Sequence, residues 1–81
     1  MKVHVYDTHI HTNTGEYIHF DVLVSDAGVS QVKQYAERYL TRLGIPVDNI
    51  KQSRCNFCHS EVANPEVQQN LLTEGHSIIR L

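Results

Sequence analysis

The sequence predicts a two-layer α+β sandwich with the element order ββαβαβ, built as a mixed four-stranded sheet with two helices on one face. Two β-rich segments at the start flank a short turn, which indicates a hairpin. Two later stretches carry apolar residues at helical spacing, and a β-rich segment follows each of them. The 81 residues fit a single domain, residues 1–81.

The first two predicted strands, residues 2–10 and 16–24, alternate in character and are rich in β-branched and aromatic side chains. The turn between them contains Asn13 and Gly15, which tolerate positive φ. A two-residue turn fits this hairpin, and so does a three-residue loop that ends in a bulge at Gly15. Glycine at that position favours the bulge, although the sequence leaves both registers open.

The register decides which polar side chains become neighbours. The bulged register places Asp7 opposite Asp21 and His9 opposite His19. Tyr6, His19 and Asp21 form a further candidate group on this hairpin. They could transfer protons, but without a nucleophile a hydrogen-bonded structural cluster is the preferred interpretation.

The two predicted helices are bounded by residues typical of helix ends. The first spans about residues 29–43 and is followed by Gly44, a residue that suits the position just past a helix. The second begins with Asn64 as cap and Pro65 as first helical residue, and it ends at Gly75.

The remaining strands are predicted at residues 49–54 and 77–81. Because helices connect the second, third and fourth strands, these three strands are expected to run parallel, and the first antiparallel to them. This arrangement brings the cysteine segment close to His4. At the opposite edge, near the hairpin tip, it gathers three other histidines: His9, His11 and His76.

Composition excludes several classes of protein. The formal net charge of -2 provides no basic surface for nucleic acid. The first residues lack the apolar region of a signal peptide, and no apolar run approaches the ~20 residues of a membrane span. We therefore expect a cytoplasmic protein with neither nucleic-acid nor membrane partners, in which cysteines stay reduced.

Residues 55–61 carry both cysteines of the chain. Cys55, Cys58 and His59 match the C-x-x-C-H motif of covalent haem attachment, but no export signal is visible and Met1 is the only methionine, which argues against haem. Two thiolates at this spacing form half of a zinc site. His4 is the nearest outside ligand, so the predicted metal ligands are Cys55, Cys58, His59 and His4.

Two alternatives for this segment stay open. A thiol-dependent redox protein or enzyme could use Cys55 or Cys58, although thioredoxin-type sites place the first cysteine at a helix start, and none is evident here. Alternatively, Cys55 and Phe57 pack into the core while Cys58 and His59 are ordinary loop residues.

A second candidate site is the segment from Asp7 to His11. Alternation along a strand places His9 and His11 on one face, where they could form a metal-binding pair. The simpler interpretation, that alternate positions face water, is preferred because no further ligand is evident from the sequence.

Three segments together resemble a family of small, mostly bacterial proteins known only as a domain of unknown function. They are His4 to Thr8 (HVYDT), His19 to Val22 (HFDV) and Cys55 to Ser60 (CNFCHS). The resemblance covers essentially the whole chain. It implies a compact α+β domain that stands alone and supplies no activity, substrate or cofactor.

The sequence therefore favours a non-enzymatic binding or interaction module with a candidate cysteine-based zinc site and no catalytic residues. The alternative is a small thiol-dependent redox protein or enzyme. A homodimer or an unidentified protein partner could complete the site and cover the open sheet face.

Overall fold

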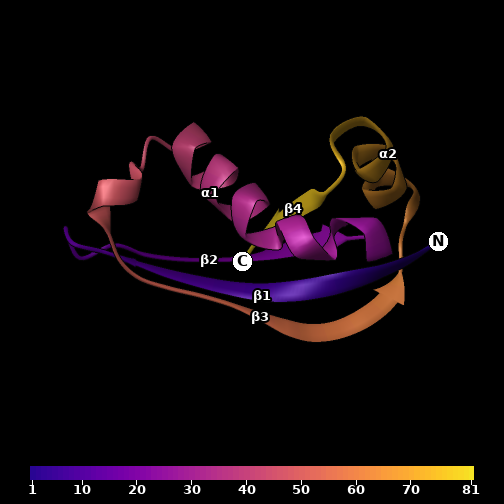
Figure 1. Ribbon diagram of the computed structural model, residues 1–81, viewed down its shortest axis with the longest axis horizontal. Coiled ribbons are helices and arrows are strands. Elements are labelled where there is room, and N and C mark those ends of the chain that lie inside the picture. The colour runs from indigo at the N-terminus through magenta and orange to yellow at the C-terminus, as the bar shows by residue number, and fades with distance from the viewer.

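The computed structural model describes residues 1–81 and has the predicted α+β class and element order (Figure 1). The strands are β1 (Lys2–Thr12), β2 (Tyr17–Val24), β3 (Ile50–Val62) and β4 (Ser77–Arg80). The helices are α1 (Val32–Arg42) and α2 (Pro65–Glu74), with short 3-10 helices η1 (Asp26–Gln31) and η2 (Val47–Asn49). Neither α-helix has the length and apolar character that a membrane crossing requires.

The sheet has the strand order β3-β1-β2-β4, and every neighbouring pair is antiparallel. As predicted, β2 and β3 run in the same direction, but β4 runs the opposite way, so the prediction of a mixed sheet is wrong. The cause lies in the connections. The segment with α1 returns to the hairpin end, where β3 starts. The short α2 instead stays near the end where β3 finishes, so β4 begins there, with Ser77 beside Leu23.

The hairpin adopts the bulged register. Asp7 lies opposite Asp21, and His9 lies opposite His19. Gly15 has a φ of +89°, and its N–H donates to the carbonyl of Thr12 at 3.2 Å. Glycine reaches this backbone conformation without steric cost, so Gly15 fixes the register that the sequence left open.

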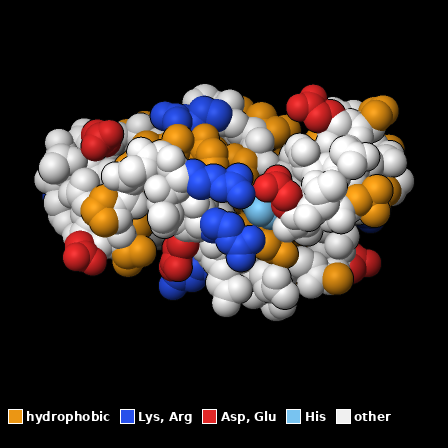
Figure 2. All heavy atoms as spheres, turned by 90° about the horizontal axis from the view of Figure 1, so that it is seen from above, with side chains coloured by type: hydrophobic (Ala, Val, Ile, Leu, Met, Phe, Trp, Pro, Cys, Tyr) orange, Lys and Arg blue, Asp and Glu red, His pale blue; other side chains and the backbone are white.

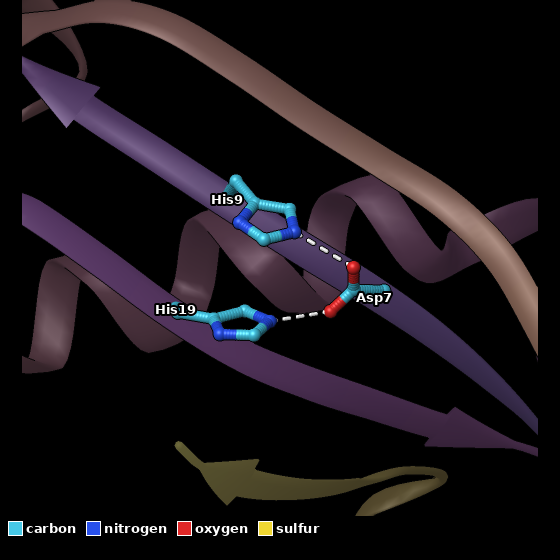
Figure 3. A group of neighbouring side chains, drawn as sticks. All are labelled: Asp7, His9 and His19. Carbon is cyan, nitrogen blue, oxygen red and sulfur yellow. Dashed lines mark hydrogen bonds and ion pairs between the residues drawn. The ribbon is translucent and has the colours of Figure 1, made fainter.

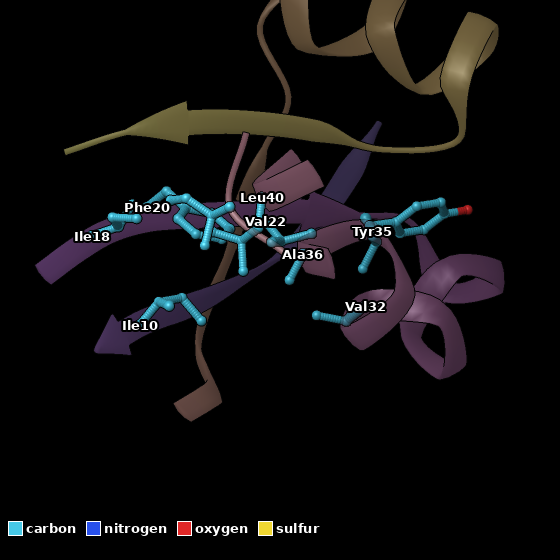
Figure 4. Close-up of a cluster of buried hydrophobic side chains, with 10 residues drawn as sticks. Ile10, Ile18, Phe20, Val22, Val32, Tyr35, Ala36 and Leu40 are labelled. Atoms are coloured by element: carbon cyan, nitrogen blue, oxygen red, sulfur yellow. The ribbon is translucent and has the colours of Figure 1, made fainter. Parts of the chain in front are cut away.

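Two buried clusters form the core. The larger one lies between α1 and the hairpin (Figure 4) and comprises Ile10, Ile18, Phe20, Val22, Val24, Val32, Tyr35, Ala36, Leu40 and Ile45. The smaller one packs α2 against the sheet and comprises Val3, Val5, Leu23, Ala63, Val67 and Leu71. Fully burying a side chain such as Phe20 stabilises the fold by roughly 1.5–3 kcal/mol.

The two helices contact alternate side chains of β2: α1 packs on Val22 and Val24, and α2 packs on Leu23. Side chains alternate between the faces of a strand, so α2 covers the face opposite α1, at one end only. The prediction that both helices share one face therefore does not hold along β2, although both helices lie above β1 and β3 in the view of Figure 1. The rest of the α2 face carries no helix.

Polar and aromatic contacts link the two helices. Arg42 of α1 forms an ion pair with Glu74 of α2 at 3.2 Å, and Tyr35 stacks on His76 with ring centroids 4.1 Å apart. Figure 2 shows Lys and Arg side chains gathered on the upper side of the molecule, around a histidine. The prediction that His76 joins His9 near the hairpin tip is wrong, because antiparallel β4 starts at the other end of the sheet.

We expect two glycine substitutions to differ in cost. Gly15 and Gly75 both have positive φ, but a β-carbon at Gly15 would meet nothing within 4 Å, whereas one at Gly75 would lie 2.8 Å from the Tyr35 hydroxyl. Gly15→Ala should lower the free energy of unfolding by about 1 kcal/mol through backbone strain. Gly75→Ala should lower it by about 2 kcal/mol or more, because buried Tyr35 must also move. Chemical denaturation measures both, and equal losses would contradict a role for the Tyr35 contact.

Candidate functional site

Asp7, His9 and His19 meet on the sheet face that α1 does not cover (Figure 3). Asp7 and His9 are two residues apart on β1, so they point to the same side. His19 lies directly opposite His9 on β2, in the register that the Gly15 loop fixes. In the view of Figure 3, α1 lies behind the strands that carry these three side chains.

The carboxylate of Asp7 accepts a hydrogen bond on each oxygen. Nε2 of His9 donates to Oδ2 at 2.7 Å, and Nε2 of His19 donates to Oδ1 at 2.5 Å. The two imidazole rings stack with centroids 4.1 Å apart. One potential ligand atom from each residue lies within 4.8 Å of the others, and the chain contains no other group of three or more such residues this close together.

The facing carboxylates of Asp7 and Asp21 have pKa values that are shifted in opposite directions. Hydrogen bonds from His19 and then His9 hold the pKa of Asp7 below its usual range. Burial raises the pKa of Asp21 above its usual range, and the negative charge of Asp7 raises it further. The site therefore holds a firmly ionised carboxylate next to one whose charge is disfavoured.

A shallow depression of about 450 Å³ adjoins the cluster and is lined by His9, His11, Tyr17, Gln52 and Arg54. The hydroxyl of Tyr17 lies 2.5 Å from Nδ1 of His9, and the Tyr17 ring stacks on His11 at 4.9 Å. Arg54 on β3 is the neighbour of His9 across the β1–β3 pair. His9 thus belongs both to the polar cluster and to the wall of the depression.

The predicted cysteine ligands lie within β3 and have different surroundings. Cys55 is half-buried, and its Sγ accepts a hydrogen bond from Oγ1 of Thr8 at 3.2 Å. Burial raises the pKa of the Cys55 thiol. Cys58 is exposed and occupies the bulge position that has no partner on β1. Its Sγ lies 3.2 Å from Nδ1 of His59, whose Nε2 lies 3.5 Å from a Glu61 oxygen.

His4, the fourth predicted ligand, is engaged elsewhere. Its Nδ1 lies 2.7 Å from Oγ of Ser60, and its Nε2 pairs with Asp26. This hydrogen bond lowers the pKa of Asp26. No surface depression borders His4 or Ser60, so the contact links β1 to β3 rather than facing a binding pocket. The structure therefore does not gather the four predicted ligands, and their zinc site stays a prediction.

Tyr6 does not join His19 and Asp21. It packs edge-to-face against Phe57 and contacts the core beneath α1. Alternation along β1 turns Tyr6 away from the face that Asp7 occupies.

The partnership of Asp7 and His9 with His19 was not predicted from the sequence. The strand pattern indicated His9 and His11 as a metal pair, but His11 stacks on Tyr17 instead. The available signal was the hairpin register, because the bulged alternative already placed His19 opposite His9. The sequence would have predicted the three-residue site only if the bulged register had been chosen over the two-residue turn.

Replacing Asp21 by Asn should stabilise the protein near neutral pH by about 0.5 kcal/mol, because it removes a charge that burial disfavours and that lies opposite the like charge of Asp7. The pKa of Asp21 is raised by folding, so its ionisation weakens the fold only as pH rises through that pKa. The gain should therefore vanish at about pH 3, where the carboxyl is protonated in both states. Urea denaturation at about pH 7 and about pH 3 tests this. A gain that persists in acid would contradict the electrostatic cause.

Comparison with known proteins agrees with the fold. The NMR structure of protein NE1680 from Nitrosomonas europaea superimposes with a TM-score of 0.80 at 30% sequence identity, covering 100% of this chain and 95% of that one. No curated protein matches this chain. The sequence profile of one family, described as a domain of unknown function, matches residues 1–81. The chain therefore belongs to the DUF2024 family.

Proposed function

We propose that this protein is a non-enzymatic metal-binding module that holds a divalent transition-metal ion through Asp7, His9 and His19. The observation that carries the proposal is the convergence of two imidazole nitrogens on one carboxylate at the open sheet face. A homodimer or protein partner stays a separate prediction.

The donor set fits a borderline-soft cation. Imidazole nitrogen suits zinc, copper, iron and nickel, and one carboxylate beside two histidines is a frequent set for such ions. The Nε2 protons of His9 and His19 bridge to Asp7. A bound ion would replace these two protons, because a ligating imidazole must carry a free lone pair.

The surroundings also favour a cation. Asp7 and Asp21 are adjacent carboxylates, and the pKa of Asp21 is raised by burial and then by the charge of Asp7. A divalent ion would relieve this repulsion. Because all three donors project from paired strands, little backbone rearrangement is needed to bring them together.

Zinc titration of protein purified without a histidine tag tests the proposal. His9→Ala, His19→Ala and Asp7→Asn should each weaken zinc binding by about 100-fold or more, since loss of even a second-shell partner typically costs roughly 10- to 100-fold. Isothermal titration calorimetry measures the affinity, and circular dichroism confirms folding. Wild-type affinity in all three variants would overturn the proposal.

Two controls separate this site from the alternatives. His11→Ala removes a histidine on the same face that lies outside the cluster, so zinc affinity should stay within about twofold. The double variant Cys55→Ser/Cys58→Ser should also keep its affinity. If zinc binding fails only in the double variant, the site belongs to the predicted set around Cys55 and Cys58.

Thiol chemistry at Cys58 is a second candidate function. Exposed Cys58 contacts His59, and His59 in turn lies near Glu61, an order that can activate a thiol. Half-buried Cys55, whose pKa burial raises, has the opposite environment.

We expect iodoacetamide to alkylate Cys58 at least about tenfold faster than Cys55, because the thiolate is the reacting species. His59→Ala should slow the reaction at Cys58, whereas His11→Ala should not change it. Mass spectrometry of each cysteine over time measures the rates. An unchanged rate at Cys58 in His59→Ala would remove the basis for this candidate.

A further inference from the structure

We propose that the depression beside the metal cluster binds the oxyanion group of a small molecule, a carboxylate or a phosphate, between the metal ion and Arg54. This inference rests on the proposed function, since it names the ligand class of the same site. The geometry assigns Arg54 as the anchoring cation and leaves the metal as the second contact.

The depression directly adjoins the cluster. His9 contributes to both, because its Nε2 faces Asp7 and its ring also lines the depression. Arg54 is the cross-strand neighbour of His9 and projects from β3 on the same side. Three protein ligands leave a coordination position open on a zinc-like ion, and in metal sites that act on small molecules this position receives the ligand.

The lining selects for negative charge. None of its five residues is acidic, and all five carry polar groups. Arg54 forms no ion pair within the chain, unlike Arg42, which is paired with Glu74. A guanidinium presents N–H groups in a planar fork that fits a carboxylate or phosphate in bidentate fashion. Gln52 adds an amide donor at the same wall.

Tyr17 links metal binding at His9 to the hydrogen-bonding groups that line the depression. While the His9 proton is on Nε2, where it faces Asp7, the Tyr17 hydroxyl donates to Nδ1 across 2.5 Å. When Nε2 binds a metal, Nδ1 carries the ring proton and donates to its neighbour instead. The Tyr17 oxygen then accepts, and its own hydrogen is free to point toward an anion. Metal binding thereby adds a hydrogen-bond donor to the wall.

Size favours a small ligand. A volume of about 450 Å³ lies within the range of roughly 300–1,000 Å³ that is typical of small-molecule sites. The depression is open and only one of its five lining residues is hydrophobic, so it does not enclose an extended hydrocarbon or a protein segment. Its positive groups, supplied by the metal and Arg54, recognise the charged end of the ligand.

Calorimetric titration of zinc-loaded protein with malonate and, separately, with phenyl phosphate tests the inference and distinguishes the two oxyanion classes. We expect at least one probe to bind zinc-loaded protein about tenfold or more tightly than metal-free protein. Arg54→Gln should weaken that binding by about 10- to 100-fold, the loss of a charge-assisted bidentate contact, while zinc affinity stays within about twofold. Arg38→Gln, on the far helix face, should change neither affinity.

The outcomes separate this inference from the proposed function. Absence of binding by both probes to zinc-loaded wild type overturns the inference, while measured zinc binding leaves the proposed function standing. Equal anion affinity with and without zinc also overturns it, because the metal would then contribute nothing. Unchanged anion affinity in Arg54→Gln removes the assigned anchor. Circular dichroism of Arg54→Gln verifies that any loss occurs in folded protein.

Discussion

The register of the β1–β2 pair determines both the core and the polar site. Ile10 faces Ile18 toward α1, while Asp7 and His9 point to the other face together with His19. Because side chains alternate with a period of two, a slip by one residue would turn one strand over. It would expose half of the core and separate the histidines. The Gly15 loop therefore controls a site that lies several residues away from it.

The short second helix leaves this site open. α2 covers Val3, Val5 and Leu23 at one end, and the next positions outward on the same face are Asp7 and Asp21. A longer helix over this face would remove both carboxylates from water, at a cost of several kcal/mol for each unpaired charge. The same short connection also reverses β4, which carries His76 to the Tyr35 side instead of the hairpin tip.

Local signals in the sequence predicted the elements well, and long-range signals did not. Asn64, Pro65 and Gly75 define α2 as expected, with the Asn64 side chain accepting from the N–H of Val67. The direction of β4 depends on the end of the sheet to which α2 and its loops return the chain. The local residue pattern does not determine this. The extent of β3 was also missed, because its outer edge is exposed and lacks the apolar alternation that marks a half-buried strand. Predicting the candidate site required one such long-range feature, the β1–β2 register that places His19 opposite His9.

Stability alone gives little account of the Asp7, His9 and His19 cluster. The side chains of these residues are 36%, 29% and 30% exposed, and ion pairs at such positions contribute about 0–1 kcal/mol. The two rings stack with centroids 4.1 Å apart, and both Nε2 atoms face the same carboxylate, so three donor groups point to one place on the surface. The proposed metal ion would meet two imidazole nitrogens and one carboxylate there, a donor set that transition-metal ions favour. The arrangement is thus better matched to a bound cation than to a role in stability.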